Sequence, residues 1–119
     1  MEKIVIVISL CTFYLFANAD TQTMINLDSA CLSCHAQQQI PNGLIYKRYL
    51  MQYSTDKRME KAMLKYLKNP SKETSIMPPQ FFLKFPMKEK FELDDIVLKT
   101  NIREYLNKFN IREHIIIEK

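Results

Sequence analysis

The chain has 119 residues, which is room for one small domain. Its single glycine, Gly43, argues against a glycine-rich phosphate-binding loop, and so against nucleotide binding of that kind. The formal net charge of +4 suits a docking face for acidic partners, but the lysines are interleaved with acidic residues and too dispersed to indicate a nucleic-acid-binding protein.

Residues 1–19 are typical of a secretory signal peptide. Lys3 precedes an apolar run of 14 residues, 4–17, and the small residues Ala17 and Ala19 occupy the two positions that signal peptidase reads. A membrane-spanning helix needs about 20 residues, so the run is short for one. We therefore predict cleavage after Ala19, with an uncleaved membrane anchor as the alternative.

Cleavage leaves a mature domain of residues 20–119. We expect Cys11 to be discarded with the signal, because the bulky Leu10 before it does not fit a lipidation motif. The predicted location is the periplasm, as an exported soluble protein, and membrane attachment is expected only if the signal stays uncleaved.

Residues 29–39, SACLSCHAQQQ, contain the two remaining cysteines, Cys31 and Cys34. A short helix is predicted here, with Asp28 or Ser29 as its cap. Export places the thiols in an oxidising compartment, but a disulfide across two intervening residues would restrict the unfolded chain little. A thioredoxin-like redox pair calls for a preceding strand and a βαβ context, and the sequence has no clear pattern of that kind.

Zinc would need four ligands with familiar spacing. The mature chain offers two cysteines and two histidines, and His35 is adjacent to Cys34 while His114 is far away. The remaining interpretation is covalent haem attachment, since Cys-x-x-Cys-His is the signature of c-type haem. The thiols of Cys31 and Cys34 would add to the two vinyl groups of the porphyrin, and His35 would supply an imidazole nitrogen to the iron. One haem c is therefore predicted, attached through Cys31 and Cys34.

Three segments follow the motif. The sequence Pro-Asn-Gly at residues 41–43 indicates a turn, and residues 44–53 are ambiguous. Residues 54–69 are predicted to form a helix that Ser54 or Thr55 caps. Apolar side chains recur along this helix at helical spacing; they are Met59, Met63, Tyr66 and Leu67.

The C-terminal part is divided between a loop and a helix. Prolines at positions 70, 78, 79 and 86 make residues 70–86 mostly loop. The last helix is predicted over residues 94–109. The carboxylates of Asp94 and Asp95 would stabilise its N-terminus, which is the positive end of the helix dipole. Its apolar face is formed by Leu98, Ile102, Tyr105, Leu106 and Phe109. Residues 110–119 are a short tail, either a strand or continued helix.

Three features together resemble one family. They are CLSCH near the mature N-terminus, TSIMPPQ in the second half, and an amphipathic C-terminal helix with a tyrosine. Over residues 27–109 the chain resembles the small monohaem c-type cytochromes of class I. The resemblance implies an all-α fold, a small cytochrome c-like helical domain wrapped around one covalently attached haem. The chain departs from the family in two ways: only 11 mature residues precede Cys31, and the methionine loop lacks a glycine.

Met77 is predicted to be the sixth ligand of the iron. Methionine is a soft thioether ligand, and it raises the reduction potential in cytochromes c. Met77 lies in a loop, 42 residues after His35, and the following Pro78 and Pro79 fix the backbone and preorganise the loop. The family that the chain resembles places its methionine ligand in a similar proline-flanked loop.

Met87 and His114 are the alternatives for the sixth position, and His114 would give a bis-histidine site. If Met87 is not a ligand, it is expected to fill apolar space under the loop. If His114 is not a ligand, it is expected to be a surface residue on the tail. The remaining mature methionines are expected to pack in the core (Met51, Met59 and Met63) or to lie near the N-terminus (Met24).

A haem with both axial positions filled cannot easily bind substrate, so we predict an electron carrier rather than an enzyme. No catalytic constellation of acid–base or nucleophilic residues is visible in the sequence. The alternatives are a haem-based ligand sensor or peroxidase-like protein with an open axial site, and an electron-transfer subunit of a larger redox complex.

Redox proteins are the expected partners: a membrane-bound reductase or oxidase, or a periplasmic peroxidase. Four lysines are candidates for docking them, or belong to an ordinary solvated surface: Lys47, Lys72, Lys84 and Lys88. Because a small domain buries little apolar area of its own, we expect the haem-free chain to be largely unfolded. The residues predicted to line the porphyrin or pack behind it are Leu32, Leu44, Ile45, Tyr49, Leu64, Leu67, Phe81, Phe82, Leu98, Ile102 and Tyr105.

Overall fold

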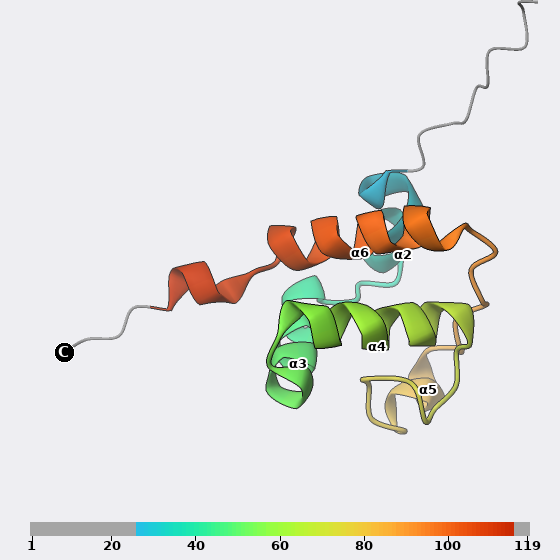
Figure 1. Cartoon of the computed structure of the whole chain (residues 1–119). Helices are drawn as coiled ribbons and strands as arrows, with labels where there is room; N and C mark the ends of the chain where they lie inside the picture. Colours follow the sequence, from blue (N-terminus) through green and yellow to red (C-terminus); the bar gives the residue numbers. More distant parts are fainter. Residues whose placement is uncertain (1–25, 116–119) are drawn as a thin grey trace, which may run out of the picture.

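The computed structural model describes residues 26–115, and over this range the chain forms five α-helices, α2 to α6, and no strand (Figure 1). The all-α class predicted from the sequence is therefore confirmed for these residues. The predicted signal peptide with Cys11, Met24 and the tail residues 116–119 lie outside the described range. Between residues 26 and 115, no helix has the length and apolar character needed to cross a bilayer.

The amphipathic helix predicted in the middle of the chain forms as α4, Asp56–Lys68. Thr55 caps its start, because the Thr55 Oγ1 accepts a hydrogen bond of 3.4 Å from the backbone N–H of Arg58. Met59 and Met63, four residues apart, lie on the same face of α4 and are both buried. The prediction of a helix over 54–69 is confirmed, with Thr55 as the cap.

The C-terminal helix forms as α6, Asp95–Lys108. The Asp94 carboxylate caps it by accepting a hydrogen bond of 2.7 Å from the backbone N–H of Ile96. The buried side chains of α6 recur at intervals of three and four residues, so one face of the helix is turned to the core. They are Leu98, Asn101, Ile102, Tyr105 and Leu106.

The cysteine motif lies on two short consecutive helices. The first, η2 (Asp28–Leu32), is a π turn, in which the N–H of Ser33 donates to the carbonyl of Asp28, five residues earlier. The second, α2, spans Ser33–Gln37. Such π turns are rare in proteins, and those that occur are often found at functional sites. This one contains Cys31.

The cap predicted for the motif helix is wrong. Asp28 and Ser29 lie inside η2, and the side chain of Asn26 does the capping from outside: its Oδ1 accepts a hydrogen bond of 2.9 Å from the Ser29 N–H. Asparagine is among the strongest capping residues because its short side-chain oxygen reaches an N–H one turn further along.

The predicted turn at residues 41–43 is also wrong. Helix α3, Asn42–Tyr53, begins there, and the chain reverses instead at Gln38–Gln39, where Gln39 adopts a left-handed φ of 54°. Proline and asparagine are turn residues, but both also suit the beginning of a helix, where the first N–H groups have no intrahelical partner. The ambiguous residues 44–53 are therefore helical.

The two remaining short elements are α5, Phe81–Lys84, and η3, Ile111–His114. Helix α5 interrupts the segment 70–86, which is otherwise irregular as predicted. The tail begins with the 3₁₀ turn of η3 rather than with a strand or a continuation of α6.

Helix α4 packs against both α3 and α6, so the core lies between these three helices (Figure 1). Figure 1 places α2 beside α6, and places α5 on the other side of α4. The buried apolar residues of this core cluster are Leu27, Tyr46, Tyr49, Met59, Met63, Ile102, Tyr105 and Leu106. The Tyr46 hydroxyl within it donates a hydrogen bond of 3.0 Å to the Asn110 Oδ1, which satisfies a fully buried phenol.

The methionines of α3 and α4 differ in burial. Met59 and Met63 are buried as predicted, whereas Met51 is 79% exposed, so its predicted packing in the core is wrong. We expect Met59→Ala, which removes a completely buried side chain, to lower the free energy of unfolding by about 2–5 kcal/mol. The same substitution at Met51 should change it by less than about 0.5 kcal/mol. Urea denaturation of the two variants measures this difference, and equal losses would contradict the observed packing.

Candidate functional site

Cys31, Cys34 and His35 lie together on η2 and α2. Cys31 is partly buried and, with its neighbour Leu32, packs against the core cluster, while Cys34 is exposed. Both thiols are free. One turn of helix separates them, so a flat group bound to both sulfur atoms would lie along one side of this helical segment.

Two contacts hold this segment against the rest of the fold. Leu27, just before η2, is 1% exposed and belongs to the core cluster. The Lys108 ammonium at the end of α6 lies 3.3 Å from the Asp28 carboxylate at the start of η2. The helical segment that carries the motif therefore contacts α6 through Asp28, the first residue of η2, and the core through its apolar side chains.

The imidazole of His35 is held by α3 and α6. Its Nδ1 is hydrogen-bonded to the Oδ1 of Asn42, the first residue of α3. The Tyr105 ring of α6 meets it edge-to-face, with ring centroids 6.1 Å apart. Because an amide oxygen only accepts, Nδ1 carries the proton and Nε2 is the nitrogen available to a metal ion.

Cys31 is not an activated thiol. Burial raises the pKa of the Cys31 thiol, and the positive charge of Lys88 opposes only part of that rise. Redox-active and nucleophilic cysteines instead have lowered pKa values, since the thiolate is the reactive form. This argues against the thioredoxin-like interpretation of the Cys-x-x-Cys pair.

Lys88 lies near both cysteines on the segment between α5 and α6. Its Nζ lies 3.5 Å from the centroid of the Phe91 ring, a cation–π geometry, and burial lowers the pKa of this ammonium. Residues 88–93 and Ser29 and Ala30 of η2 line a hollow of about 490 Å³.

Met77 lies on a separate element, in the loop that connects α4 to α5. Its side chain is partly buried, and its N–H donates a hydrogen bond of 3.1 Å to the Ser75 Oγ. The preceding Ile76 packs against the same core cluster as Cys31 and Leu32. The axial pairing of His35 with Met77 stays a prediction.

The two alternative sixth ligands differ in their surroundings. Met87 is partly buried, and its Sδ accepts a hydrogen bond of 3.8 Å from the Tyr66 hydroxyl of α4. His114 is exposed in η3. The sulfur of Met87 thus has a partner within the protein, and the imidazole of His114 faces solvent.

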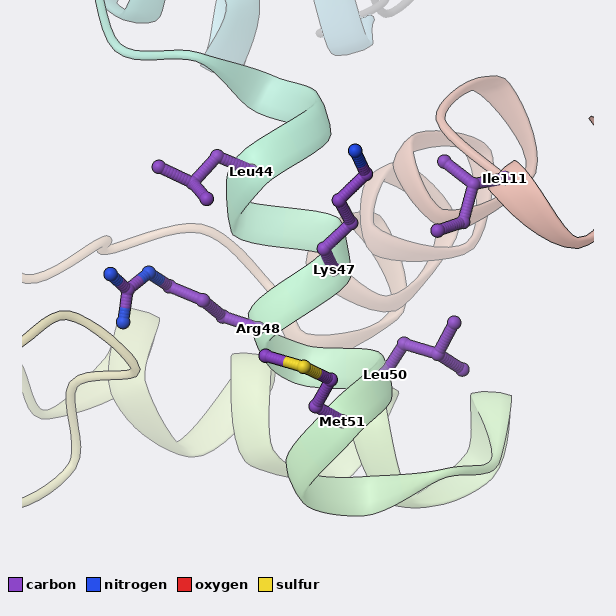
Figure 2. A pocket seen from close by; sticks show the side chains of 6 residues that line it. All are labelled: Leu44, Lys47, Arg48, Leu50, Met51 and Ile111. Carbon is purple, nitrogen blue, oxygen red and sulfur yellow. The ribbon is translucent and has the colours of Figure 1, made fainter.

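A second hollow, of about 420 Å³, lies against the outer face of α3 (Figure 2). Leu44, Lys47, Arg48 and Met51 project from α3 around it, with Ile111 from η3. Of the predicted docking lysines, Lys47 borders this hollow; Lys72 and Lys84 are exposed elsewhere, and Lys88 is partly buried. Leu44, predicted to contact the porphyrin, is 43% exposed here.

Arg48 stands out on this face, because its Nε is buried and has no hydrogen-bond partner within residues 26–115. A buried unpaired guanidinium nitrogen is costly unless an acceptor reaches it. Arg48 and Asn42 both escaped the sequence analysis. Asn42 carries a signal, as a polar residue soon after the motif histidine, but the sequence Pro-Asn-Gly indicates a turn there.

Within residues 26–115, no three His, Cys, Asp or Glu side chains gather closely enough to share a metal ion. Cys31, Cys34 and His35 thus remain a group of adjacent donors on one helical segment. Comparison of the chain with protein-family models, curated proteins and solved structures gave no match.

Proposed function

We propose that this protein is an exported one-electron carrier that holds a single haem c through Cys31 and Cys34, with His35 and Met77 as axial ligands. The bound iron supplies the chemistry, a change between the ferrous and ferric states. The protein's part is to attach the porphyrin, fill both axial positions and exclude water.

One observation carries the proposal. The Cys-x-x-Cys-His motif presents two free thiols one turn apart, and the imidazole beside them has its Nδ1 occupied by Asn42. Haem and metal-binding histidines have this arrangement, with one ring nitrogen donating to an acceptor and the other facing the metal. The donor set therefore fits a covalently bound haem with an axial histidine.

Arg48 is a candidate for one further contact with the proposed haem. A haem carries two propionate carboxylates, and guanidinium groups bind carboxylates well because several N–H donors match their geometry. The buried Arg48 Nε lacks an acceptor in the described part of the chain, so Arg48 is a candidate partner for a propionate.

Both axial ligands would come from the chain itself, and this favours electron transfer over catalysis at the iron. A filled sixth position blocks substrate or ligand binding, and a thioether ligand raises the potential. Tyr105, which is 5% exposed, meets the His35 ring edge-on and so shields one side of the imidazole from solvent. We propose redox proteins as partners, either a membrane-bound reductase or oxidase or a periplasmic peroxidase.

Mass spectrometry of the exported polypeptide tests the proposal. We expect the intact mass to exceed that of residues 20–119 by one haem, and the addition to survive acid extraction, because thioether bonds hold the porphyrin. Peptide mapping should place it on Cys31 and Cys34. A polypeptide without any added group would refute the proposal.

A further inference from the structure

We propose that Asn42 is a positioning residue: by accepting the hydrogen bond from His35 Nδ1, it sets the orientation and electron donation of the axial imidazole, and so the reduction potential. This inference rests on the proposed haem site. It assigns to α3 a part in tuning a cofactor that is attached to η2 and α2.

The Asn42 side chain is committed to this contact. Asn42 is the first residue of α3, one position after the N-cap Pro41, and α3 begins without a side-chain capping bond. Its Oδ1 is hydrogen-bonded to His35 Nδ1 instead. The amide oxygen therefore serves the imidazole rather than its own helix.

Tyr105 fixes Asn42 in turn. Its hydroxyl lies 3.1 Å from the Asn42 carbonyl oxygen and 3.3 Å from the Asn42 Oδ1, so its one proton is shared between the two oxygens in a bifurcated hydrogen bond. The Tyr105 ring also meets the His35 ring edge-on. Tyr105 is buried, so α6 holds the amide and the imidazole in one arrangement.

The strength of the acceptor at Nδ1 has a definite electronic effect. A stronger acceptor draws the Nδ1 proton away from the ring and makes Nε2 a better electron donor. Donation to iron favours the ferric state over the ferrous state, and this lowers the potential. In acceptor strength, a neutral amide such as that of Asn42 is intermediate between a carboxylate and a side chain that cannot accept a hydrogen bond.

The test is the reduction potential of the holoprotein in two variants. Asn42→Asp should lower it and Asn42→Leu should raise it, each by about tenfold in the redox equilibrium, which is about 59 mV for one electron. Opposite signs separate this role from a purely structural one. In Asn42→Leu the Tyr105 hydroxyl keeps the backbone carbonyl as acceptor, so no buried phenol is left unpaired.

Asn110 offers a matched control. Its Oδ1 accepts hydrogen bonds from the Tyr46 hydroxyl and from the Arg112 N–H, each of 3.0 Å, where the Oδ1 of Asn42 is bonded to an imidazole. Asn110→Asp should therefore shift the potential much less than Asn42→Asp. Equal shifts at the two positions would overturn the proposal, because they would show a general effect of charge or packing.

Proton exchange gives a second measurement. In the ferrous holoprotein, NMR should find the His35 Nδ1–H slow to exchange with solvent in the wild type and in Asn42→Asp, and fast in Asn42→Leu.

Asp is nearly isosteric with Asn, so an unchanged potential in Asn42→Asp overturns the proposal even where the leucine variant does not fold. A protein with attached haem but unshifted potentials refutes this inference alone, whereas missing haem refutes the proposed function.

Discussion

A Cys31→Ser/Cys34→Ser variant is expected to lack haem and to lose its cooperative far-UV melt. Within residues 26–115, only nine apolar side chains are buried, which is a small core for a domain of this length. The porphyrin face would add apolar area that contributes about 25 cal/mol per Å² when buried. Circular dichroism of the purified variant measures the outcome.

Ser33 supplies the control for this variant. It lies between the two cysteines on the same helical segment, is exposed, and its Oγ donates only to the carbonyl of Ser29 within the described part of the chain. The Ser33→Ala variant should keep both the attached haem and the cooperative far-UV thermal transition. A cooperative, native-like melt of the haem-free double variant would show that the helices are stable without haem. The haem would then not be required as part of the core.

If the proposed ligation is correct, Met77→Ala is expected to abolish a weak near-infrared charge-transfer band of the ferric protein, because that band reports a methionine–iron bond. Loss of the thioether should also lower the potential by more than about 59 mV, a tenfold change in the one-electron equilibrium. Carbon monoxide, which we expect to bind the ferrous wild type poorly, should bind the variant readily. Optical spectra test the band and the binding of carbon monoxide, and a spectrophotometric redox titration measures the potential.

Met87→Ala is the matched control, since Met87 is the nearest alternative in the chain. Its sulfur accepts from Tyr66, so this variant should keep the band and lose only local packing. The opposite result, with the band lost in Met87→Ala and kept in Met77→Ala, would make Met87 the ligand. Rapid, tight carbon monoxide binding by the wild type would favour a ligand sensor or a peroxidase-like protein over an electron carrier.

Local signals predicted most of the helices. Thr55 and Asp94 are short polar residues that begin α4 and α6, and the apolar periodicity that follows each of them matches the observed buried face. The same signals failed at residues 41–43, because Pro-Asn suits both a turn and a helix start. Met51 shows a second limit: an apolar residue in a helix is buried only if its face meets a neighbour, and sequence spacing did not reveal which face of α3 does so.

By itself, the sequence determined which donor groups lie together, because two thiols and an imidazole within five residues need no tertiary contact to come together. It also determined the helical class, since caps and periodicity act within one or two turns. Only the tertiary structure decided what surrounds His35. Asn42 is seven residues from His35 and 63 from Tyr105, and these three side chains meet only because α3 and α6 converge on the motif. Hydrogen bonds between residues so far apart in the sequence depend on helix packing rather than on local propensity, so no local sequence pattern predicts them.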